Sequence, residues 1–254
     1  MNEKVAQNLK LVIEYDGTRY VGWERQDNGL SIQAVLEDAL FTITRERVLT
    51  EASGRTDAGV HARAQVVSVA ISRKIMPRKL RLGLNAVLPD DVAVLDIEEA
   101  AEGFHARKSA KSKHYRYTIL RGPARRPLAR LTSFHFPQAL DVQRMDAAAR
   151  LLEGRHDFSA FAKEAARKKS CVRTILEARV TAENEFVHVD LTGTGFLYNM
   201  VRIVTGTLIE VGQGRRPMES VAALLEGAKR THAGFTVPPH GLMLMSVHYP
   251  EPRQ

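Results

Sequence analysis

The order of the predicted secondary-structure elements is the feature that most constrains the fold of this chain. Apolar and β-branched runs with alternating spacing predict strands, and apolar residues at helical spacing predict helices. In the first half they give strands at 9–15, 47–52, 64–71 and 92–97, and helices at 32–43 and 77–87. Ser31 suits the N-cap of the first helix, and Pro77 suits the first turn of the second. The predicted order is therefore β-α-β-β-α-β.

The second half repeats this order of elements, without residue-level identity to the first half. Strands are predicted at 112–120, 172–181, 185–191 and 242–248, with Glu183 and Asn184 in a hairpin turn. Helices are predicted at 142–152, capped by Asp141, at 196–211 and at 218–227. We therefore expect an α+β protein made of two ferredoxin-like halves, residues 1–105 and 106–254. Their mixed, mainly antiparallel sheets would carry helices on one face and leave the other face for a ligand.

A loop between two predicted strands, residues 53–63, is the first candidate for chemistry. It is too long for a two-residue hairpin turn, and Gly54 and Gly59 bracket Asp57. Arg55 and Arg63 place cations on either side of Asp57, which favours an ionised carboxylate. Such a carboxylate can act as a nucleophile. The same pattern is also typical of a hairpin loop that carries a surface salt bridge.

The charge of the chain indicates an anionic partner. The formal net charge is +8 and the isoelectric point is about 9.7. Such an excess either attracts nucleic acid or only keeps the protein soluble. Clustering favours nucleic acid, because loop-like groups of cations suit a phosphate backbone. The clusters are Arg73, Lys74, Arg78, Lys79 and Arg81; Arg107, Lys108, Lys111, Lys113 and Arg116; Arg121, Arg125, Arg126 and Arg130; and Arg167, Lys168, Lys169 and Arg173.

Cysteine content and hydropathy indicate a cytoplasmic protein. The single cysteine, Cys171, cannot form a disulfide within the chain, which fits a reducing compartment. Because Cys171 begins a strand-like run, we expect it to pack rather than to react. The first ten residues lack the apolar core of a signal peptide, and no stretch has the length of a membrane span.

Several short motifs are distributed along the chain. The central one is Gly54-Arg55-Thr56-Asp57-Ala58-Gly59-Val60-His61-Ala62. The others are Tyr15-Asp16-Gly17-Thr18, Gly22-Trp23, Arg25-Gln26, Ser31-Ile32-Gln33, Leu84-Asn85-Ala86-Val87-Leu88-Pro89, Phe104-His105-Ala106-Arg107, Tyr115-Arg116-Tyr117, Asp157-Phe158-Ser159-Ala160-Phe161, Asn199-Met200-Val201-Arg202 and His240-Gly241-Leu242. These motifs resemble those of the TruA-type tRNA pseudouridine synthases, and they occur in the order of that family from about residue 9 to about residue 250.

The resemblance implies roles for individual residues of a basic active-site cleft between the halves. Asp57 would be the nucleophile, and Arg202, in an otherwise apolar helix, would be its counter-ion. Tyr115 would line the uridine site, and Arg55 would contact the RNA and hold a flipped nucleotide. The remaining loop residues expected to bind substrate are Gly54, Thr56 and His61. Independently of the resemblance, alternation along the strand predicts that Tyr115 and Tyr117 share one face, opposite His114 and Arg116.

The activity implied is conversion of uridine to pseudouridine at positions 38, 39 and 40 of the tRNA anticodon arm. No cofactor is expected, because substrate and product contain the same atoms, and the family implies a homodimer acting on tRNA. Attack by Asp57 on the base and on the sugar are both compatible with this outcome. Two positions depart from the family pattern: Phe235 stands where proline is usual, and Asn199 stands where some relatives have histidine.

Two other classes of function are compatible with parts of the sequence. A non-catalytic RNA-binding protein or chaperone on the same fold would use the basic clusters but would not need Arg55, Asp57, Tyr115 and Arg202 together. A metal-dependent RNA hydrolase would need a metal site. No His-x-x-x-His pair encloses a glutamate, so no metal site is expected.

Overall fold

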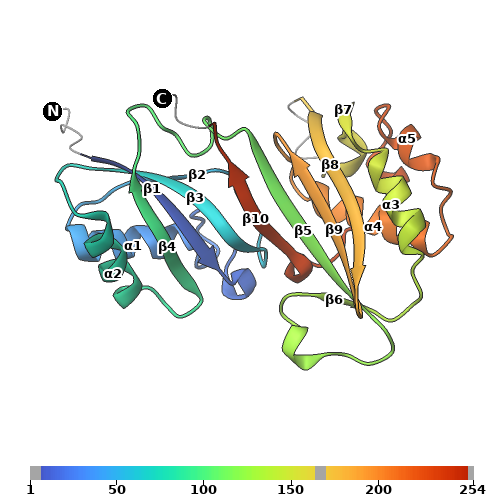
Figure 1. The fold of residues 1–254 in the computed structure, drawn as a ribbon, viewed down its shortest axis with the longest axis horizontal. Coiled ribbons are helices and arrows are strands. Elements are labelled where there is room, and N and C mark those ends of the chain that lie inside the picture. The colour runs from blue at the N-terminus through green and yellow to red at the C-terminus, as the bar shows by residue number, and fades with distance from the viewer. Residues whose placement is uncertain (1–6, 164–169, 251–254) are drawn as a thin grey trace. The chain divides into compact units, whose positions relative to one another are not determined.

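The computed structural model describes residues 7–163 and 170–250, and the chain divides into two units (Figure 1). One unit comprises Met1–Lys111 together with Leu244–Gln254, and the other comprises Ser112–Met243. The end of the chain therefore belongs with its beginning. Three residues of a predicted basic cluster, Arg167, Lys168 and Lys169, lie outside the described residues.

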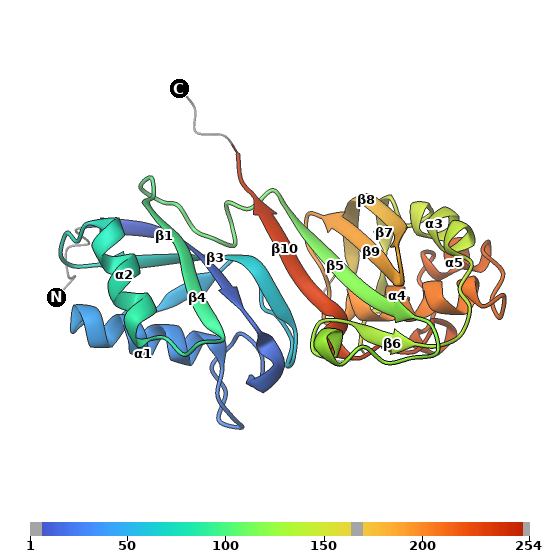
Figure 2. The same ribbon diagram turned by 60° about the horizontal axis from the view of Figure 1, so that its bottom comes forward.

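The first unit has the predicted order β-α-β-β-α-β. Its elements are β1 (Gln7–Tyr15), the short 3-10 helix η1 (Gly17–Arg19), α1 (Ile32–Thr44), β2 (Thr50–Ala52), β3 (His61–Ile71), α2 (Pro77–Val87) and β4 (Val92–Glu99). Strand β1 pairs antiparallel with β3 and β4, and β2 pairs antiparallel with β3. Helices α1 and α2 contact each other and lie on the same side of this sheet (Figure 2).

The core of the first unit forms where apolar stripes of the strands and helices meet. The side chains with 0% exposure include Leu9, Leu11 and Ile13 of β1, Leu36 and Leu40 of α1, and Leu80 and Leu84 of α2. The strand residues are spaced by two and the helix residues by four, as expected for one buried face of each element. As predicted, Ser31 caps α1, because its Oγ accepts a hydrogen bond from the Ala34 amide at 3.2 Å.

The second unit has the same order with extra short elements. It contains β5 (Ser112–Arg121), η2 (Pro127–Ala129), β6 (Phe134–Phe136), α3 (Val142–Arg150), β7 (Gly154–Asp157), β8 (Val172–Glu183), β9 (Phe186–Gly193), α4 (Met200–Gly212) and α5 (Ser220–Leu224). The chain then continues into β10 (Leu242–His248), which spans the division between the units. Strands β5, β9, β8 and β7 are antiparallel neighbours in that order, and β6 runs parallel to β5.

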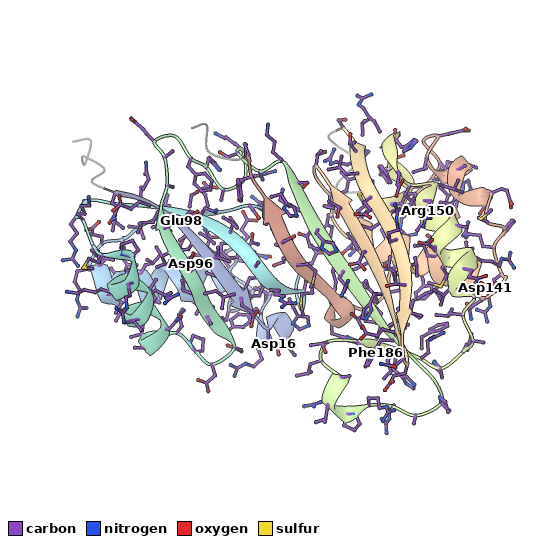
Figure 3. All side chains as sticks on the ribbon, viewed as in Figure 1. Asp16, Asp96, Glu98, Asp141, Arg150 and Phe186 are labelled. Atoms are coloured by element: carbon purple, nitrogen blue, oxygen red, sulfur yellow. The ribbon has the colours of Figure 1, made fainter. Side chains whose placement is uncertain are left out.

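One face of the second sheet is covered by helices. Helix α3 contacts β8, α4 contacts β5, and the two helices contact each other. Asp141 and Arg150 mark the two ends of α3 (Figure 3). Asp141 is the predicted N-cap, since its Oδ1 accepts from the Arg144 amide at 3.0 Å. The α+β class with mixed, mainly antiparallel sheets is therefore confirmed. Within the described ranges, no helix is both long and apolar enough to cross a membrane.

Most predicted element boundaries lie close to the observed ones, and the larger differences have physical reasons. The bounds of α2 and β10 are as predicted. Strand β3 begins at His61 rather than at residue 64, because its pairing with β1 extends to Ala62 opposite Tyr15. The predicted helix at 196–211 was wrong at its start. Helix α4 begins at Met200 because Asn199 has a φ of 61°, which is a left-handed conformation outside the helix.

Other differences concern short elements. The strand predicted at 47–52 is reduced to β2, and the helix predicted at 218–227 is reduced to α5. Strands β6 and β7 were not predicted at all. Phe134-His135-Phe136 is too short to establish a period, and Gly154-Arg155-His156-Asp157 contains no apolar side chain. They are strands because they pair with β5 and β8, respectively.

Helix α4 packs against the segment that contains Phe235, one of the positions that departs from the family pattern. An added Cβ on Gly206 would lie 1.9 Å from the carbonyl oxygen of Phe235, and the Gly234 amide donates to Thr207 Oγ1 at 2.9 Å. The Phe235 side chain is itself 41% exposed. The contact with α4 is thus made by the backbone at Phe235, and the unusual side chain points at least partly to solvent.

We expect Gly206→Ala to lower the free energy of unfolding by about 3 kcal/mol, since the new methyl group overlaps backbone that cannot move independently. Gly83→Ala, in helix α2, is the matched control. There an added Cβ meets only side-chain atoms of Ile43, the nearest at 3.4 Å. Helix propensity alone then predicts a gain of up to about 1 kcal/mol. Denaturant unfolding of both variants measures the difference, and equal stabilities would contradict the close approach at Gly206.

Candidate active site

The loop that carries Asp57 connects β2 to β3, and the backbone after η1 holds it in place. The Trp23 amide donates to the Thr56 carbonyl at 3.0 Å, and the Gly59 amide donates to the Tyr20 carbonyl at 3.3 Å. Gly22 and Asp57 form an isolated antiparallel bridge. The loop also closes on itself, because the Val60 amide donates to the Asp57 carbonyl at 3.1 Å. Asp57 is half-buried within this frame.

Glycines permit this close packing of two backbone segments. Gly22 has a φ of +113°, and an added Cβ would lie 2.7 Å from the Thr56 carbonyl oxygen. An added Cβ on Gly17 would lie 2.0 Å from the carbonyl oxygen of Val60. Both positions precede the Asp57 loop by many residues, so only the folded chain shows that they shape it.

His61 and Asp16 link η1 to the other end of the loop. His61 is 2% exposed, and its Nδ1 accepts a hydrogen bond from the Gly17 amide at 3.1 Å. The same Nδ1 lies 3.0 Å from Asp16 Oδ1. Burial by itself raises the pKa of Asp16, but hydrogen bonds from Thr18 and the nearby His61 hold the pKa below its ordinary value. The structure therefore places His61 beneath the loop rather than on its outer surface.

The three residues before Asp57 differ in exposure. Arg55 is exposed and forms an ion pair with Glu24 at 2.6 Å. Thr56 is 5% exposed, and its Oγ1 shares a hydrogen bond of 2.8 Å with the Tyr15 hydroxyl. The carbonyl of Gly54 accepts from Nε2 of Gln65 at 2.8 Å. Gln65 was not predicted to have a role, although a glutamine within the apolar run of β3 is a signal of a buried polar contact.

Tyr115 lies on β5 in the second unit. It is 7% exposed, is paired in register with Leu191 of β9, and has its ring centroid 5.0 Å from that of Phe196 in an edge-on arrangement. Tyr117 is fully buried on the same face, and its hydroxyl donates to the Pro238 carbonyl at 2.8 Å. The predicted alternation is thus confirmed, because the side chains of His114 and Arg116 are only partly buried on the opposite face.

Arg202 lies in the first turn of α4 and is half-buried. Its Nε donates to the Val237 carbonyl at 2.8 Å, and its Nη1 donates to Asn199 Oδ1 at 3.0 Å. These neutral acceptors orient the guanidinium group without neutralising its charge. Asn199 therefore has two parts in this arrangement: its left-handed backbone starts the helix, and its side chain fixes Arg202.

The expected site residues are distributed over both units. Five of them share the Asp57 loop or its immediate end, namely Gly54, Arg55, Thr56, Asp57 and His61. Tyr115 and Arg202 belong to the second unit, where their elements β5 and α4 contact each other. Each unit thus carries some of the predicted site residues.

Comparison with known proteins places this arrangement in a family. Residues 11–107 and 148–250 match the family described as tRNA pseudouridine synthase. A protein named tRNA pseudouridine synthase A from Geobacter sp. (strain M21) is 48% identical over 246 residues, which cover 96% of this chain and 100% of that relative. The protein of the same name from Pelobacter propionicus is 49% identical over 243 residues, with the same shares covered.

The chain belongs to the tRNA pseudouridine synthase family.

Among solved structures, the archaeal box H/ACA sRNP Nop10-Cbf5 complex aligns with 80% of this chain and 43% of that chain, at 11% identity. Its TM-score of 0.37 is too low to establish a shared fold.

The family match includes the Asp57 loop and Arg202. Tyr115 and the segment after it lie between the two matched ranges, but within the span aligned to the two synthases.

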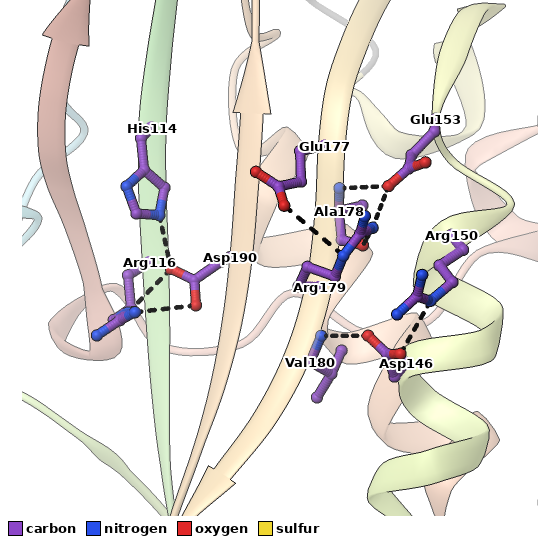
Figure 4. A network of polar contacts seen from close by, with 10 residues as sticks. All are labelled: His114, Arg116, Asp146, Arg150, Glu153, Glu177, Ala178, Arg179, Val180 and Asp190. Atoms are coloured by element: carbon purple, nitrogen blue, oxygen red, sulfur yellow. Dashed lines mark hydrogen bonds and ion pairs between the residues drawn. The ribbon is translucent and has the colours of Figure 1, made fainter.

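The face of the second sheet opposite Tyr115 carries a network of charged groups that includes Asp190 (Figure 4). Asp190 on β9 receives a hydrogen bond from Nε of Arg116 at 2.9 Å and lies 2.6 Å from Nε2 of His114. Burial raises the pKa of Asp190, but the hydrogen bonds from His114 and Arg116 outweigh burial and hold the pKa below its ordinary value. Burial and the charge of Arg116 likewise lower the pKa of His188. Arg116, which the sequence analysis placed in a basic cluster, is thus paired with Asp190.

The depressed pKa of Asp190 predicts a specific pH dependence of stability. Its ionised form contributes stability that is present above the ordinary aspartate pKa and is lost as pH falls through the folded-state pKa. We therefore expect Asp190→Asn to be less stable than wild type near pH 7, and the difference to shrink below about pH 4. Urea unfolding over a pH series measures this difference.

The matched control is Asp96→Asn, which replaces an exposed strand aspartate on β4 (Figure 3). Its effect on stability is expected to stay within about 0.5 kcal/mol across the series. A difference between wild type and Asp190→Asn that stays constant down to about pH 3 would show that Asp190 is not held by charge.

Proposed function

We propose that this protein isomerises uridine to pseudouridine at positions 38, 39 and 40 in the anticodon arm of tRNA, with Asp57 as the nucleophile. Family membership supports the reaction class. The observation that carries the proposal is the loop of the half-buried Asp57, whose backbone is held by hydrogen bonds and in which Arg55 lies close to Asp57 in sequence. A nucleophile fixed in this way loses little freedom when the substrate arrives.

The chemistry requires bond exchange without oxidation or reduction. The carboxylate of Asp57 attacks the nucleoside, the N-glycosidic bond breaks, and the base turns. A bond then forms between carbon 5 and the sugar, and the bond to Asp57 breaks, which regenerates its carboxylate. The carbon 5 proton leaves to solvent, and N1 takes up a proton in its place. Attack on the base and attack on the sugar lead to the same product. Because uridine and pseudouridine have the same composition and no redox change occurs, the reaction requires no cofactor.

The remaining site residues support a flipped uridine. Taking a base out of its stack costs a few kcal/mol of free energy, and stacking that base on an aromatic side chain recovers about 1–3 kcal/mol. Tyr115 offers such a ring, already fixed by its contact with Phe196. Its hydroxyl is also a candidate base for the carbon 5 proton. In this proposal Arg55 holds the extruded nucleotide, Arg202 is the counter-ion of Asp57, and Gly54, Thr56 and His61 shape the loop that receives the substrate.

The partner is tRNA, bound by a homodimer in the cytoplasm. The basic clusters differ in how many of their side chains already pair with acidic side chains. Arg73 lies 3.8 Å from the carboxylate of Glu46, and Arg116 is paired with Asp190 at 2.9 Å. The segment of residues 121–130 carries four arginines, and no acid occurs between residues 121 and 140. We assign this arginine segment to the phosphate backbone of the RNA.

The arginine segment is ordered although it is exposed. Arg125 and Arg126 are exposed, and Leu128, in the short helix η2, is 100% exposed. Arg130 Nη1 donates to the Pro127 carbonyl at 3.0 Å, which closes the short helix η2. Arg126 forms an exposed ion pair with Glu185 at 3.0 Å, a type of pair that exchanges readily for a phosphate. The segment thus presents cations on a pre-formed support.

The central test is Asp57→Asn, which removes the nucleophile and keeps the shape of the side chain. We expect it to abolish pseudouridine formation and to change tRNA affinity by less than about tenfold, because phosphate contacts remain. The measurement is release of tritium from tRNA labelled at carbon 5 of uracil, with filter binding in parallel. The wild-type protein should release tritium.

Other outcomes distinguish the remaining candidates. A wild-type protein that binds tRNA without releasing tritium would be a non-catalytic RNA-binding protein. Cleavage of the RNA chain that a chelator prevents would indicate a metal-dependent hydrolase. Near wild-type turnover by Asp57→Asn under single-turnover conditions would remove Asp57 from the role of nucleophile.

The second test concerns the salt dependence of tRNA binding. If the cations contact on the order of six phosphates, affinity should fall about a thousandfold between 50 and 200 mM salt. Replacing Arg125 and Arg126 together with alanine should reduce the slope of log affinity against log salt by about 1–2. Arg150→Ala is the control, because Arg150 is paired with Asp146 on α3 at 3.0 Å. An unchanged slope in the double variant would mean that the arginine segment does not face RNA.

A further inference from the structure

A glutamine with no exposed surface lies in the middle of β3. Gln65 is 0% exposed, and its neighbours in the strand include Val66 at 3% and Val67 at 0%. Burying an amide side chain among apolar groups is costly unless its polar atoms find partners. Such a residue therefore indicates a specific polar contact, and its partners show what the contact is for.

The partners of Gln65 belong to the segment that leads into Asp57. Its Oε1 accepts a hydrogen bond from Ser53 Oγ at 2.6 Å, and its Nε2 donates to the Gly54 carbonyl at 2.8 Å. Only the amide nitrogen can donate to a carbonyl, so Gly54 fixes which way the amide faces. The Ser53 amide also donates to the Val66 carbonyl at 2.8 Å, next to Gln65 in the strand. Two consecutive loop residues are thus fixed to β3.

Tyr15 extends the same contacts to Thr56. Gln65 Nε2 makes a long contact of 3.5 Å with the Tyr15 hydroxyl oxygen, and that hydroxyl shares a bond of 2.8 Å with Thr56 Oγ1. Burial raises the pKa of Tyr15 to about 12, so the hydroxyl keeps its proton at neutral pH. From the other side, the Trp23 amide donates to the Thr56 carbonyl at 3.0 Å.

We infer that Gln65 is a positioning residue for the Asp57 carboxylate, acting with Tyr15 through Ser53, Gly54 and Thr56. This inference rests on the proposed function, because it assigns Gln65 a part in the same reaction. Gln65 does not touch substrate. It fixes the backbone that precedes Asp57, and a displacement of about 1 Å of a reacting group can lower a rate about a hundredfold.

The main test is Gln65→Met, which keeps the length of the side chain and removes both polar contacts. We expect the single-turnover rate constant for pseudouridine formation to fall by at least about tenfold, with KM for tRNA within about threefold of wild type, since phosphate contacts are unchanged. A role in stability alone would lower the melting temperature and the folded fraction without lowering the rate constant of the folded enzyme.

The chain offers a matched control at the other end of the same sheet. Gln7 is 5% exposed, and it bonds Glu99 at 2.7 Å and the Ile75 amide at 3.0 Å, away from the Asp57 loop. Gln7→Met therefore removes a buried glutamine with similar contacts. We expect it to lower stability and to leave the rate constant within about twofold of wild type.

Gln65→Glu gives a readout that a structural role would not produce. An ionised carboxylate at this position accepts from Ser53 but cannot donate to the Gly54 carbonyl, whereas the protonated acid can. Burial raises the pKa of a carboxyl group, which brings this titration toward neutral pH. The rate of Gln65→Glu relative to wild type should therefore rise as pH is lowered from about 8 to about 5.

Tyr15→Phe completes the set and remains informative if Gln65→Met does not fold. It should lower the rate constant at constant KM, and its effect combined with Gln65→Met should be less than the product of the two, because both act on one network. Wild-type rate constants in folded Gln65→Met or Tyr15→Phe, or a flat pH ratio for Gln65→Glu, would overturn the inference. Absence of pseudouridine with wild type and Gln7→Met would instead overturn the proposed function, and the inference with it.

Discussion

The path of the chain at Asp57 depends on hydrogen bonds that reach it from opposite sides. The amide of Trp23 holds the Thr56 carbonyl from the segment after η1, while Gln65 and Tyr15 hold Gly54 and Thr56 from the sheet. Two glycines allow the segments to approach closely enough for these bonds to form. A carboxylate on such a loop is carried by a rigid support, which is the condition for a group that must meet its substrate in one geometry.

The second unit combines an apolar face with a charged one on a single sheet. Alternation along β5 places Tyr115 and Tyr117 on one face, where Tyr115 packs on Phe196, and His114 and Arg116 on the other face. There Asp190 engages the cations, so positive charge in the sequence is not the same as positive charge available to RNA. The arginine segment differs because no acid follows it along the chain until Asp141, and the ion pair that Arg126 forms with Glu185 is exposed.

Much of the fold was predictable because it depends on local patterns. Helix α2 begins at a proline and carries buried leucines one turn apart, so both its position and its face follow from the sequence. The predictions were wrong where strand pairing or an unusual backbone conformation decides the structure. Strand β7 exists because it pairs with β8, and α4 starts late because Asn199 adopts a left-handed conformation while its side chain bonds Arg202.

The sequence by itself determined the Asp57 loop as the candidate centre, the faces of Tyr115 and Arg116, and the order of elements in both units. The Asp57 loop was indicated by the resemblance of its motif to a known family, whereas the faces and the order of elements follow from the periods of strands and helices, which are properties of neighbouring residues. Only the tertiary structure decided which residues support Asp57. Gln65 and Gly22 act on the loop through contacts between strands and segments that are remote along the chain, and such contacts leave no periodic trace in the sequence.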